Sequence, residues 1–431
     1  MKSIDWYQDF VDLKYKPSKN DVICLFRFEP ALKMSRVEAA GRIASESSAG
    51  TWTTLTKLPK TIEKVMATSF EINGNFVKVA YPINIWEPGN MPQLLSGIAG
   101  NIFGMKALEN LKLVDVLLPI QYTRHFRGPE FGIEGIRRLL KVKKRPIAGA
   151  VAKPKIGWSA KEHAKIAYET WIGGFDLVKD DENLTSTQFN KFEQRVKFCS
   201  SMRDKAEKES GERKSALINI TGETRQMIKR AKMLHDFGFE YVMIDVITVG
   251  ISALQTLREV CHDYKLAIHA HRAMHAAFDR NPRHGISMLF MAKICRLIGV
   301  DQIHIGTVIG KLVGTQSEVL DIKSEITANR VNHKKSSVLD QHWNNIKPVL
   351  PVSSGGIHPG IIPDVLKIMG TDIALLVSGG IHGHPNGTRD GACAAMQSIE
   401  AAMKKISLPE YAKTHPELRT ALEKWGRLRP Q

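Results

Sequence analysis

The sequence predicts an α/β protein with a C-terminal (β/α)8 TIM barrel, preceded by an N-terminal α+β domain of the ferredoxin-like type. From Arg145 onward, short apolar runs rich in Val and Ile alternate with amphipathic stretches of helical length, and eight such units follow one another. Alternation of this kind implies a parallel sheet covered on both faces, and eight units suggest a closed barrel. An open, doubly wound sheet is the alternative, but no GxGxxG motif follows an early strand.

Hydrophobic periodicity and turn residues place the individual elements. In the N-terminal part we expect strands at 22–28 and 113–120, helices at 35–47 and 92–103, and a hairpin of 67–73 with 75–83 that turns at Asn73-Gly74. The barrel strands are expected at 147–153, 175–179, 215–220, 241–246, 267–272, 302–307, 349–354 and 374–379. Helices between them are expected at 159–172, 223–237, 251–264, 283–299 and 387–405. Because 431 residues exceed one ordinary core, we expect two domains, 1–125 and 126–431, the second with a C-terminal helical tail.

The composition, with 43% hydrophobic and 24% charged residues, is typical of a water-soluble globular protein. No apolar run has the length needed to span a bilayer, and the first residues lack the apolar core of a signal peptide. The five cysteines are scattered without a CxxC pair, which indicates reduced thiols and argues against a disulfide framework or a zinc site. We therefore expect a cytoplasmic protein.

The net charge of +17 is compatible with nucleic acid, an anionic membrane or a phosphorylated substrate. Lys and Arg are spread along the chain and are often interspersed with Glu, as in Lys205-Ala206-Glu207-Lys208-Glu209, which is typical of a solvated surface. No zinc-finger, basic-zipper or RNA-recognition motif is present. A non-catalytic nucleic-acid or scaffold protein is kept as an alternative, and salt-dependent RNA binding without a magnesium requirement would support it.

In a barrel, functional residues gather at the C-terminal ends of the strands. The first expected strand ends in Lys153-Pro154-Lys155, and two lysines one residue apart point to the same side of an extended chain. Ordinary surface lysines are the simpler interpretation. At a strand end, crowding of two ammonium groups is expected to lower the pKa of each and to suit one of them to proton transfer.

The second expected strand ends in Lys179-Asp180-Asp181-Glu182. Alternation places Lys179 and Asp181 on one face, with Glu182 at the rim. Two carboxylates suit Mg2+, but an ammonium group repels a metal. A salt-bridged structural cluster is one explanation. The other is that Lys179 carries CO2 as a carbamate, which converts a cation into a third anionic oxygen ligand.

The fifth expected strand ends in His269-Ala270-His271-Arg272, with His275 following, and the sixth contains His304. A single barrel histidine is more often packed than catalytic, but several His and Arg residues at strand ends favour an anionic substrate. The loop 306–314 has glycines on both sides of Lys311 and is expected to close with this lysine directed inward.

The last two strands end in glycine pairs, Ser354-Gly355-Gly356 and Ser378-Gly379-Gly380. Barrels commonly bind phosphate after strands seven and eight through backbone N–H groups, although tight turns explain isolated glycines equally well. Position alone therefore predicts a metal-assisted enzyme that acts on a small, doubly phosphorylated anion.

Several segments, in order along the chain, resemble the large chains of ribulose-1,5-bisphosphate carboxylase/oxygenase (RuBisCO). The segment 173–182 resembles the activation site of this family, 152–157 its first catalytic lysine segment, 271–276 its histidine segment, and 306–312 its closing loop. The segments 354–358, 379–385, 46–53 and 100–104 are similar to further family segments. Any one of these similarities is weak, whereas together and in this order they are highly specific.

The resemblance implies a set of catalytic roles. Lys179, carbamylated by a CO2 that is not the substrate, would bind Mg2+ with Asp181 and Glu182, and its carbamate oxygen would remove the C3 proton of the substrate. Lys155 and His271 would assist this proton transfer. The other implied roles are protonation of the final carbanion by Lys153, closure over the site by Lys311, and orientation of Lys311 by Glu46.

The resemblance also implies a substrate-binding set. Asn101 would contact the reaction intermediate. Arg272, His304, Ser354, Gly355 and Gly356 would bind the substrate and one phosphate, and Thr51, Trp52, Gly379 and Gly380 would bind the other. In this family Glu46, Thr51, Trp52 and Asn101 come from the neighbouring subunit, so an obligate homodimer is expected, with larger rings as an extension.

Two residues depart from the pattern of plant-type chains, because Val151 replaces a threonine and Ser378 replaces the first of three glycines. Both leave the geometry of the phosphate sites open. The sequence looks closer to archaeal form III or the intermediate II/III group, which implies no small subunit and a role in nucleotide or pentose-phosphate metabolism. The alternative in the same fold is a RuBisCO-like enolase or isomerase acting on a methylthio sugar phosphate, but such proteins typically replace several of the residues named above.

Overall fold

The computed structural model describes residues 7–51, 53, 55–309, 315–332 and 338–428. Its contacts form two compact units, one of 1–127, 274–297 and 328–346, the other of 128–273, 298–327 and 347–431. Two later segments therefore pack with the N-terminal residues, and the domain boundary expected at 125/126 stays a prediction. No helix in the described residues combines the length and the apolar character needed to cross a membrane.

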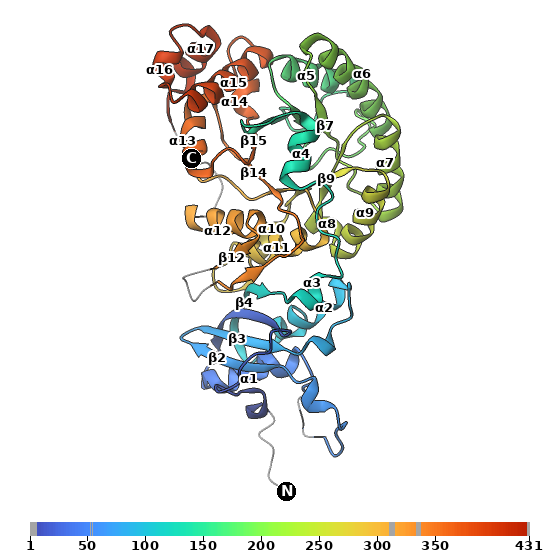
Figure 1. Cartoon of the computed structure of the whole chain (residues 1–431), viewed down its shortest axis with the longest axis vertical. Coiled ribbons are helices and arrows are strands. Elements are labelled where there is room, and N and C mark those ends of the chain that lie inside the picture. Colours follow the sequence, from blue (N-terminus) through green and yellow to red (C-terminus); the bar gives the residue numbers. More distant parts are fainter. Residues whose placement is uncertain (1–6, 52, 54, 310–314, 333–337, 429–431) are drawn as a thin grey trace. The chain divides into compact units, whose positions relative to one another are not determined.

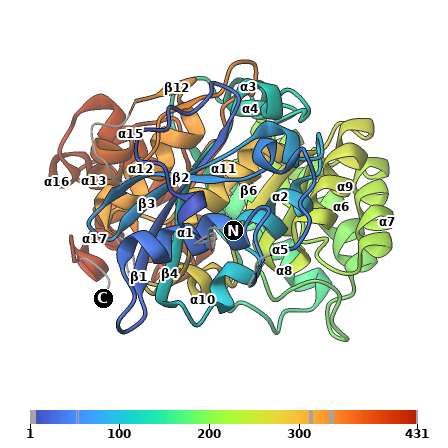
Figure 2. The ribbon, with the colours of Figure 1, turned by 90° about the horizontal axis from the view of Figure 1, so that it is seen from below.

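The first unit is built on a five-stranded sheet in the order β10-β4-β1-β3-β2. All its strand pairs are antiparallel except that of β10 with β4. Figure 2 shows the three blue strands β1, β3 and β2 side by side. The elements of this unit are β1 (Val22–Pro30), α1 (Arg36–Glu46), β2 (Thr68–Asn73), β3 (Phe76–Tyr81), α2 (Met91–Ile98), β4 (Leu108–Leu117), α3 (Ile120–Thr123), α10 (His275–Asp279), β10 (Gly285–Ile286), α11 (Met288–Ile298), β12 (Arg330–Val331) and β13 (Gln341–His342).

The elements expected in the N-terminal part are present, although some of their boundaries are shifted. The hairpin of β2 and β3 turns at Gly74, whose φ of +56° is readily adopted by glycine. The strand expected at 113–120 begins five residues earlier, at Leu108. The helix expected at 92–103 ends at Ile98 and is followed by a short 3-10 turn, Asn101–Gly104, because Gly97 and Gly100 weaken a continuous helix here.

The second unit contains an eight-stranded parallel sheet in the order β7-β6-β5-β15-β14-β11-β9-β8. A parallel bridge between Asn219 and Met243 joins the chain after β7 to β8, so the sheet nearly closes on itself. The eight predicted barrel strands are thereby confirmed, each within a few residues of its expected bounds. The strands are β5 (Ile147–Val151), β6 (Leu177–Lys179), β7 (Ser215–Leu217), β8 (Tyr241–Asp245), β9 (Ala267–His271), β11 (Gln302–His304), β14 (Leu350–Ser354) and β15 (Ala374–Leu376).

Helices follow the strands on the outside of this sheet, and α5, α6, α7 and α9 lie next to one another along one flank (Figures 1 and 2). Local sequence sets their ends: Ser159 and Glu162 form a capping box at the start of α5. The helices of the unit are α4 (Gly132–Leu140), α5 (Ala160–Ile172), α6 (Phe192–Ser210), α7 (Thr224–Asp236), α8 (Val246–Val249), α9 (Ile251–Asp263), α12 (Gln316–Thr327), α13 (Ile362–Met369), α14 (Gly379–His382), α15 (Thr388–Lys404), α16 (Leu408–Tyr411) and α17 (Pro416–Trp425).

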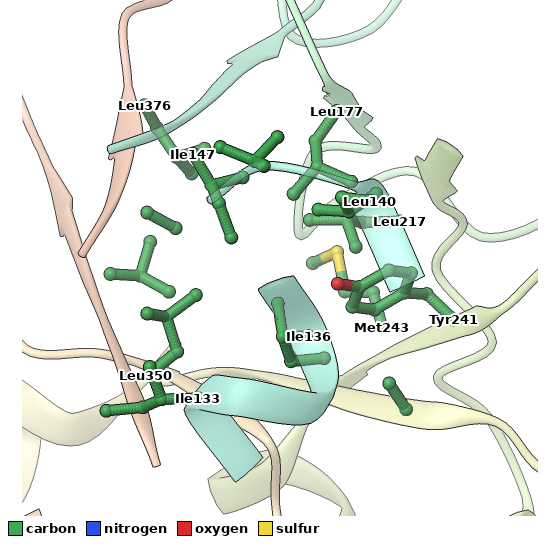
Figure 3. Close-up of a cluster of buried hydrophobic side chains, with 14 residues drawn as sticks. Ile133, Ile136, Leu140, Ile147, Leu177, Leu217, Tyr241, Met243, Leu350 and Leu376 are labelled. Carbon is green, nitrogen blue, oxygen red and sulfur yellow. The ribbon is translucent and has the colours of Figure 1, made fainter. Parts of the chain in front are cut away.

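One end of the barrel is filled by apolar side chains. Helix α4 directs Ile133 and Ile136 toward a cluster drawn from the strands (Figure 3). Several residues of this cluster are the first residues of their strands, among them Ile147 of β5, Leu177 of β6 and Leu350 of β14. The amino ends of the strands are therefore closed by packing, which leaves the opposite, carboxyl ends for a site.

Asp301 ties this closed end together. Its side chain is fully buried, and its Oδ1 accepts hydrogen bonds from the backbone N–H groups of Phe131 (2.7 Å) and Gly132 (3.0 Å) at the start of α4. Its Oδ2 accepts one from Ile268 in β9, at 3.0 Å. Burial raises the pKa of Asp301 to about 6, although these three donors oppose the shift. One carboxylate thus joins a strand to the helix that closes the barrel.

We predict that Asp301→Ala lowers the free energy of unfolding by about 3 kcal/mol or more, because three buried N–H groups lose their acceptor. Guanidinium denaturation followed by circular dichroism measures this. The matched control is Asp236→Ala, which removes an exposed i,i+4 partner of Lys232 and is expected to cost less than about 1 kcal/mol. Equal, small effects of the two substitutions would contradict the role given to Asp301.

Candidate active site

A pocket of about 680 Å3 lies at the carboxyl ends of the barrel strands. Six of its lining residues are the last residues of six strands: Val151, Lys179, His271, His304, Ser354 and Leu376. The remaining lining residues come from the loops after these strands and from the C-terminal segment: Lys153, Lys155, Asp181, Glu182, Gly355, Gly356, Ile357, His358, Ser378, Gly379, Gly380, Lys424, Trp425 and Leu428. Most of the residues singled out in the barrel sequence are therefore brought together in one pocket.

Lys179 is buried, with only 1% of its surface exposed to solvent. Its ammonium group donates a hydrogen bond to the backbone carbonyl of Asp180 at 2.8 Å. Burial lowers the pKa of Lys179 to about 8, although the carboxylates of Glu182, Asp245 and Asp181 partly offset this shift. A lysine with a lowered pKa carries a larger fraction of neutral amine near neutral pH, and only the neutral amine is a nucleophile.

The two carboxylates next to Lys179 are held by the two lysines after β5. Lys153 Nζ lies 3.0 Å from Asp181 Oδ2, and Lys155 Nζ lies 2.7 Å from Glu182 Oε1. Although burial raises the pKa of Glu182, the hydrogen bond from Lys155 and nearby positive charge lower it to about 2. Each of the two carboxylates therefore has a lysine ammonium group within ion-pair distance.

These pairings correct the expected effect of lysine crowding. The hydrogen bond from Lys155 to Glu182 raises the pKa of Lys155, where mutual repulsion with Lys153 was expected to lower it. The reason is that each lysine faces a carboxylate across the pocket, and a partner at hydrogen-bonding distance outweighs a like charge two residues away.

Asp181 and Glu182 fit Mg2+ as a pair of hard oxygen ligands that need a third. Lys179 ends the strand immediately before them and lines the same pocket, so a carbamate on its amine would present that third anionic oxygen. In the parts of the chain that the structure describes, no three side chains of His, Cys, Asp or Glu are grouped to hold a metal ion by themselves.

Asp180, between the lysine and the two carboxylates, is fixed on the outer side of the strand. Its buried carboxylate accepts from Arg195 Nε at 2.9 Å and from the backbone N–H of Asn219 at 3.0 Å, and it lies 3.1 Å from His163 Nε2. Although burial opposes ionisation, Arg195 and His163 lower the pKa of Asp180 to about 2. This network holds the backbone that carries Lys179, Asp181 and Glu182.

Two histidines complete the polar wall. His271 Nδ1 lies 2.9 Å from Asp245 Oδ1, and its Nε2 lies 3.8 Å from Glu182 Oε2. Burial and the nearby Lys179 lower the pKa of His271, although Asp245 and Glu182 oppose this shift, and the lowered pKa favours the neutral ring. His304 contacts Ser354 Oγ at 3.0 Å. The sequence analysis did not single out Asp245. Its position as the last residue of the fourth barrel strand could have identified it as a site residue.

The glycine turns after β14 and β15 also line the pocket. Gly355 and Gly356 have φ values of +115° and +75°, which favour glycine. A Cβ on Gly380 would lie 2.5 Å from the carbonyl oxygen of Ile357, so the two turns are packed backbone to backbone. The N–H of Val151 donates to Ser378 Oγ at 3.0 Å, so the two residues that depart from plant-type chains contact each other.

The other residues singled out in the sequence lie elsewhere. Arg272 is buried beside Gly306 and is not among the lining residues of the pocket. Glu46 is the last residue of α1, and Thr51 and Asn101 also belong to the first unit. Trp52 and Lys311 lie outside the described residues. The lining residues of the C-terminal segment were missed, because nothing in the sequence of the helical tail indicates where it packs.

The chain is similar to known proteins over nearly its whole length. The chain matches the family model "Ribulose bisphosphate carboxylase large chain, N-terminal domain" over residues 9–122, and the model of the catalytic domain over 132–425. It is 51% identical to a ribulose bisphosphate carboxylase of Pyrococcus abyssi, covering 99% of both chains. It is 49% identical to one of Methanocaldococcus jannaschii, covering 97% of this chain and 100% of that one.

Two solved structures are similar over nearly the whole chain. The dimeric archaeal Rubisco from Hyperthermus butylicus has a TM-score of 0.94 and 48% identity, with 98% of this chain and 100% of that chain covered. The octameric enzyme from Pyrococcus horikoshii has a TM-score of 0.92 and 51% identity, with 98% and 97% covered. The barrel strands, the pocket at their carboxyl ends and these full-length similarities lead to one assignment: the chain belongs to the ribulose bisphosphate carboxylase large-chain family.

Proposed function

We propose that this chain is a ribulose-1,5-bisphosphate carboxylase/oxygenase, a carboxy-lyase. It enolises ribulose 1,5-bisphosphate with the help of Mg2+, adds CO2 (or O2 in its place), and cleaves the carboxylated product to two molecules of 3-phosphoglycerate. The observation that carries this proposal is the buried Lys179 at a strand end, with Asp181 and Glu182 beside it and Lys153, Lys155 and His271 in the same pocket. Archaeal relatives at about half identity bear the same name.

Activation begins at Lys179. The neutral amine attacks CO2, a C–N bond forms, and one amine proton leaves to solvent, so that the lysine gains a carboxylate in place of its positive charge. Lewis-acid stabilisation of the negative charge that develops on the substrate would come from Mg2+ held by this carbamate, Asp181 and Glu182. The lowered pKa of Lys179 supports this step, because it raises the fraction of amine that can react near pH 7.

The proton transfers fall to residues that already surround the carboxylates. The carbamate oxygen of Lys179 takes the C3 proton, and Lys155 and His271 assist. Lys153 returns a proton to the carbanion that remains after cleavage. Lys153 and Lys155 are now paired with Asp181 and Glu182, the carboxylates that would hold Mg2+, and without these pairings both lysines would be available for the proton transfers. Asp245 positions His271 through the 2.9 Å contact with its Nδ1.

The remaining residues of the proposed site bind and enclose the substrate. Lys311 closes over the pocket and is oriented by Glu46, and Asn101 contacts the intermediate. One phosphate and the sugar are bound by Arg272, His304, Ser354, Gly355 and Gly356. The other phosphate is bound by Thr51, Trp52, Gly379 and Gly380.

The smallest active unit is a homodimer, because Glu46, Thr51, Trp52 and Asn101 are supplied by the second subunit. The two similar structures are described as dimeric and octameric, so assembly beyond the dimer is compatible with the family. We propose that the enzyme works without a small subunit and that it binds neither nucleic acid nor a membrane. The enolase or isomerase alternative is not favoured, because Lys153, Lys155, His271, His304 and Ser354 line the pocket together.

We predict that the wild-type protein, preincubated with bicarbonate and Mg2+, fixes 14CO2 into acid-stable 3-phosphoglycerate when ribulose 1,5-bisphosphate is added. Lys179→Ala is expected to reduce this rate by at least about a thousandfold, because the pocket loses its third anionic ligand and its base. Lys161→Ala, an exposed lysine of α5, serves as the control and is expected to keep full activity. Absence of product from the folded wild-type protein would favour the enolase or isomerase instead.

The shared site predicts complementation between two inactive variants. Glu46→Gln and Lys179→Ala subunits carrying different tags are co-expressed, and the mixed dimer is purified through both tags. If the two residues belong to different subunits at each site, the mixed dimer has one intact site and one doubly altered site, and about half of wild-type activity per dimer returns. If each site is built within one subunit, the mixed dimer stays inactive, which would contradict the proposal.

A further inference from the structure

The C-terminal segment forms part of the pocket wall. Lys424 and Trp425 end helix α17, Leu428 follows, and all three line the pocket that also contains Gly379 and Gly380. None of them has a part in the proposed reaction as set out above. The segment therefore places a cation at the pocket that the reaction has not yet used.

This segment is held firmly in place. The backbone N–H of Gly360 donates to His358 Nδ1 at 3.2 Å, so the neutral His358 ring carries its hydrogen on Nε2 and donates it to the Leu428 carbonyl at 2.8 Å. A Cβ on Gly360 would lie 1.8 Å from the carbonyl oxygen of Gly426, so the two backbones are in direct contact. The ring of Trp425 packs beside that of His358, with 5.9 Å between centroids. The wall is thus preorganised.

Lys424 is anchored close to the second glycine turn. Its ammonium group donates to the carbonyl of Gly383, the residue directly after α14, and the N–H of Gly383 donates to Gly379 at 3.0 Å. One helical turn therefore separates the anchor of Lys424 from the start of the Gly379-Gly380 turn. Capping of a helix end is the simpler explanation for such a lysine, but it uses one of the three donors of the ammonium group.

The charge of Lys424 is not neutralised by a neighbour. Within the described residues its partners are the Gly383 carbonyl and the ring of Trp425, whose centroid lies 5.3 Å from Nζ. Lys153 and Lys155, in the same pocket, are each paired with a carboxylate. A phosphate ester carries about −1.5 to −2 charges at pH 7. Backbone N–H groups at the glycine turn offer only neutral donors to such a group, whereas hydrogen bonds from a charged donor are about twice as strong.

Resting on the proposed function, we propose that Lys424 is a further phosphate-binding residue, whose ammonium group binds the phosphate of the sugar bisphosphate that occupies the Gly379-Gly380 turn. The Gly383 carbonyl fixes one N–H of the lysine, and its other two donors are directed to phosphate oxygens. The C-terminal helix thereby contributes to substrate affinity from within the barrel unit itself.

The test compares wild type with Lys424→Gln, Lys424→Arg and the control Lys413→Gln. Glutamine keeps a donor for the Gly383 carbonyl but removes the charge, and arginine keeps the charge. Lys413 is an exposed lysine of the same C-terminal region, paired with Glu410. We expect Lys424→Gln to raise the KM for ribulose 1,5-bisphosphate about tenfold and to weaken competitive inhibition by inorganic phosphate by a similar factor, with kcat within about twofold. For the Lys424→Arg and Lys413→Gln variants, the KM and the inhibition by phosphate are expected to stay within about twofold of wild type.

A Lys424→Gln variant with unchanged KM and unchanged phosphate inhibition would overturn the proposal. If such a variant differs from wild type only in a lowered melting temperature, Lys424 caps the end of a helix and does not bind phosphate. Thermal stabilisation by inorganic phosphate is measured on the same proteins without turnover. If the wild-type protein fixes no CO2 but is stabilised by inorganic phosphate, and the Lys424→Gln variant is not, then the phosphate site is supported and the assigned reaction is wrong. If wild type fixes CO2 and the variants are indistinguishable, the reaction stands and the phosphate site fails.

Discussion

A lysine amine buried among carboxylates is the constraint on which the site depends. Lys179 is inside the barrel rim, where removal from water disfavours its charged form, while Asp181, Glu182 and Asp245 favour it. The balance leaves an amine that reacts more readily than an exposed one. The same position would be unfavourable for a permanent cation next to a metal, and in the proposed mechanism a carbamate on this amine would resolve this conflict.

The neighbouring residues hold the strand end that carries Lys179 on both sides. Asp180 is tied on the outer side of β6 to Arg195, His163 and the backbone of Asn219, so the strand end is rigid. On the inner side, Lys153 and Lys155 are paired with the carboxylates of Asp181 and Glu182, which in the proposed mechanism would hold Mg2+. One set of ion pairs therefore holds together the groups to which the proposed mechanism gives catalytic roles.

The barrel explains why residues from distant parts of the chain meet here. Eight parallel strands bring their carboxyl ends to one rim, while α4 and the first residues of several strands close the opposite end with apolar side chains. Asp301 fastens α4 to β9 at that closed end. Stability and chemistry thus occupy opposite ends of the same strands, as in other barrels of this kind.

Hydrophobic periodicity predicted all eight strands, and strand-end position alone selected Lys179, Asp181, Glu182 and His271, because both depend on local pattern. Interactions between distant segments could not be predicted in this way. The pairing of Lys155 with Glu182 reverses the expected direction of the pKa of Lys155, and it depends on how two loops face each other. The contact of Leu428 with His358 joins residues 70 apart, and no periodic signal marks it. The end of α2 at Ile98 was missed because a helical pattern continued past two glycines.

The most direct test of this account is the pH dependence of 13CO2 addition to Lys179. The protein is exposed to a fixed concentration of dissolved 13CO2 at each pH, the carbamate is trapped chemically, and the labelled lysine is identified by mass spectrometry. Because only the neutral amine reacts, we predict that the rate of labelling at Lys179 rises with pH and levels off above about 8. A rate that keeps rising as for an ordinary lysine, with a pKa of about 10.4, or a label found on other lysines but not on Lys179, would contradict it.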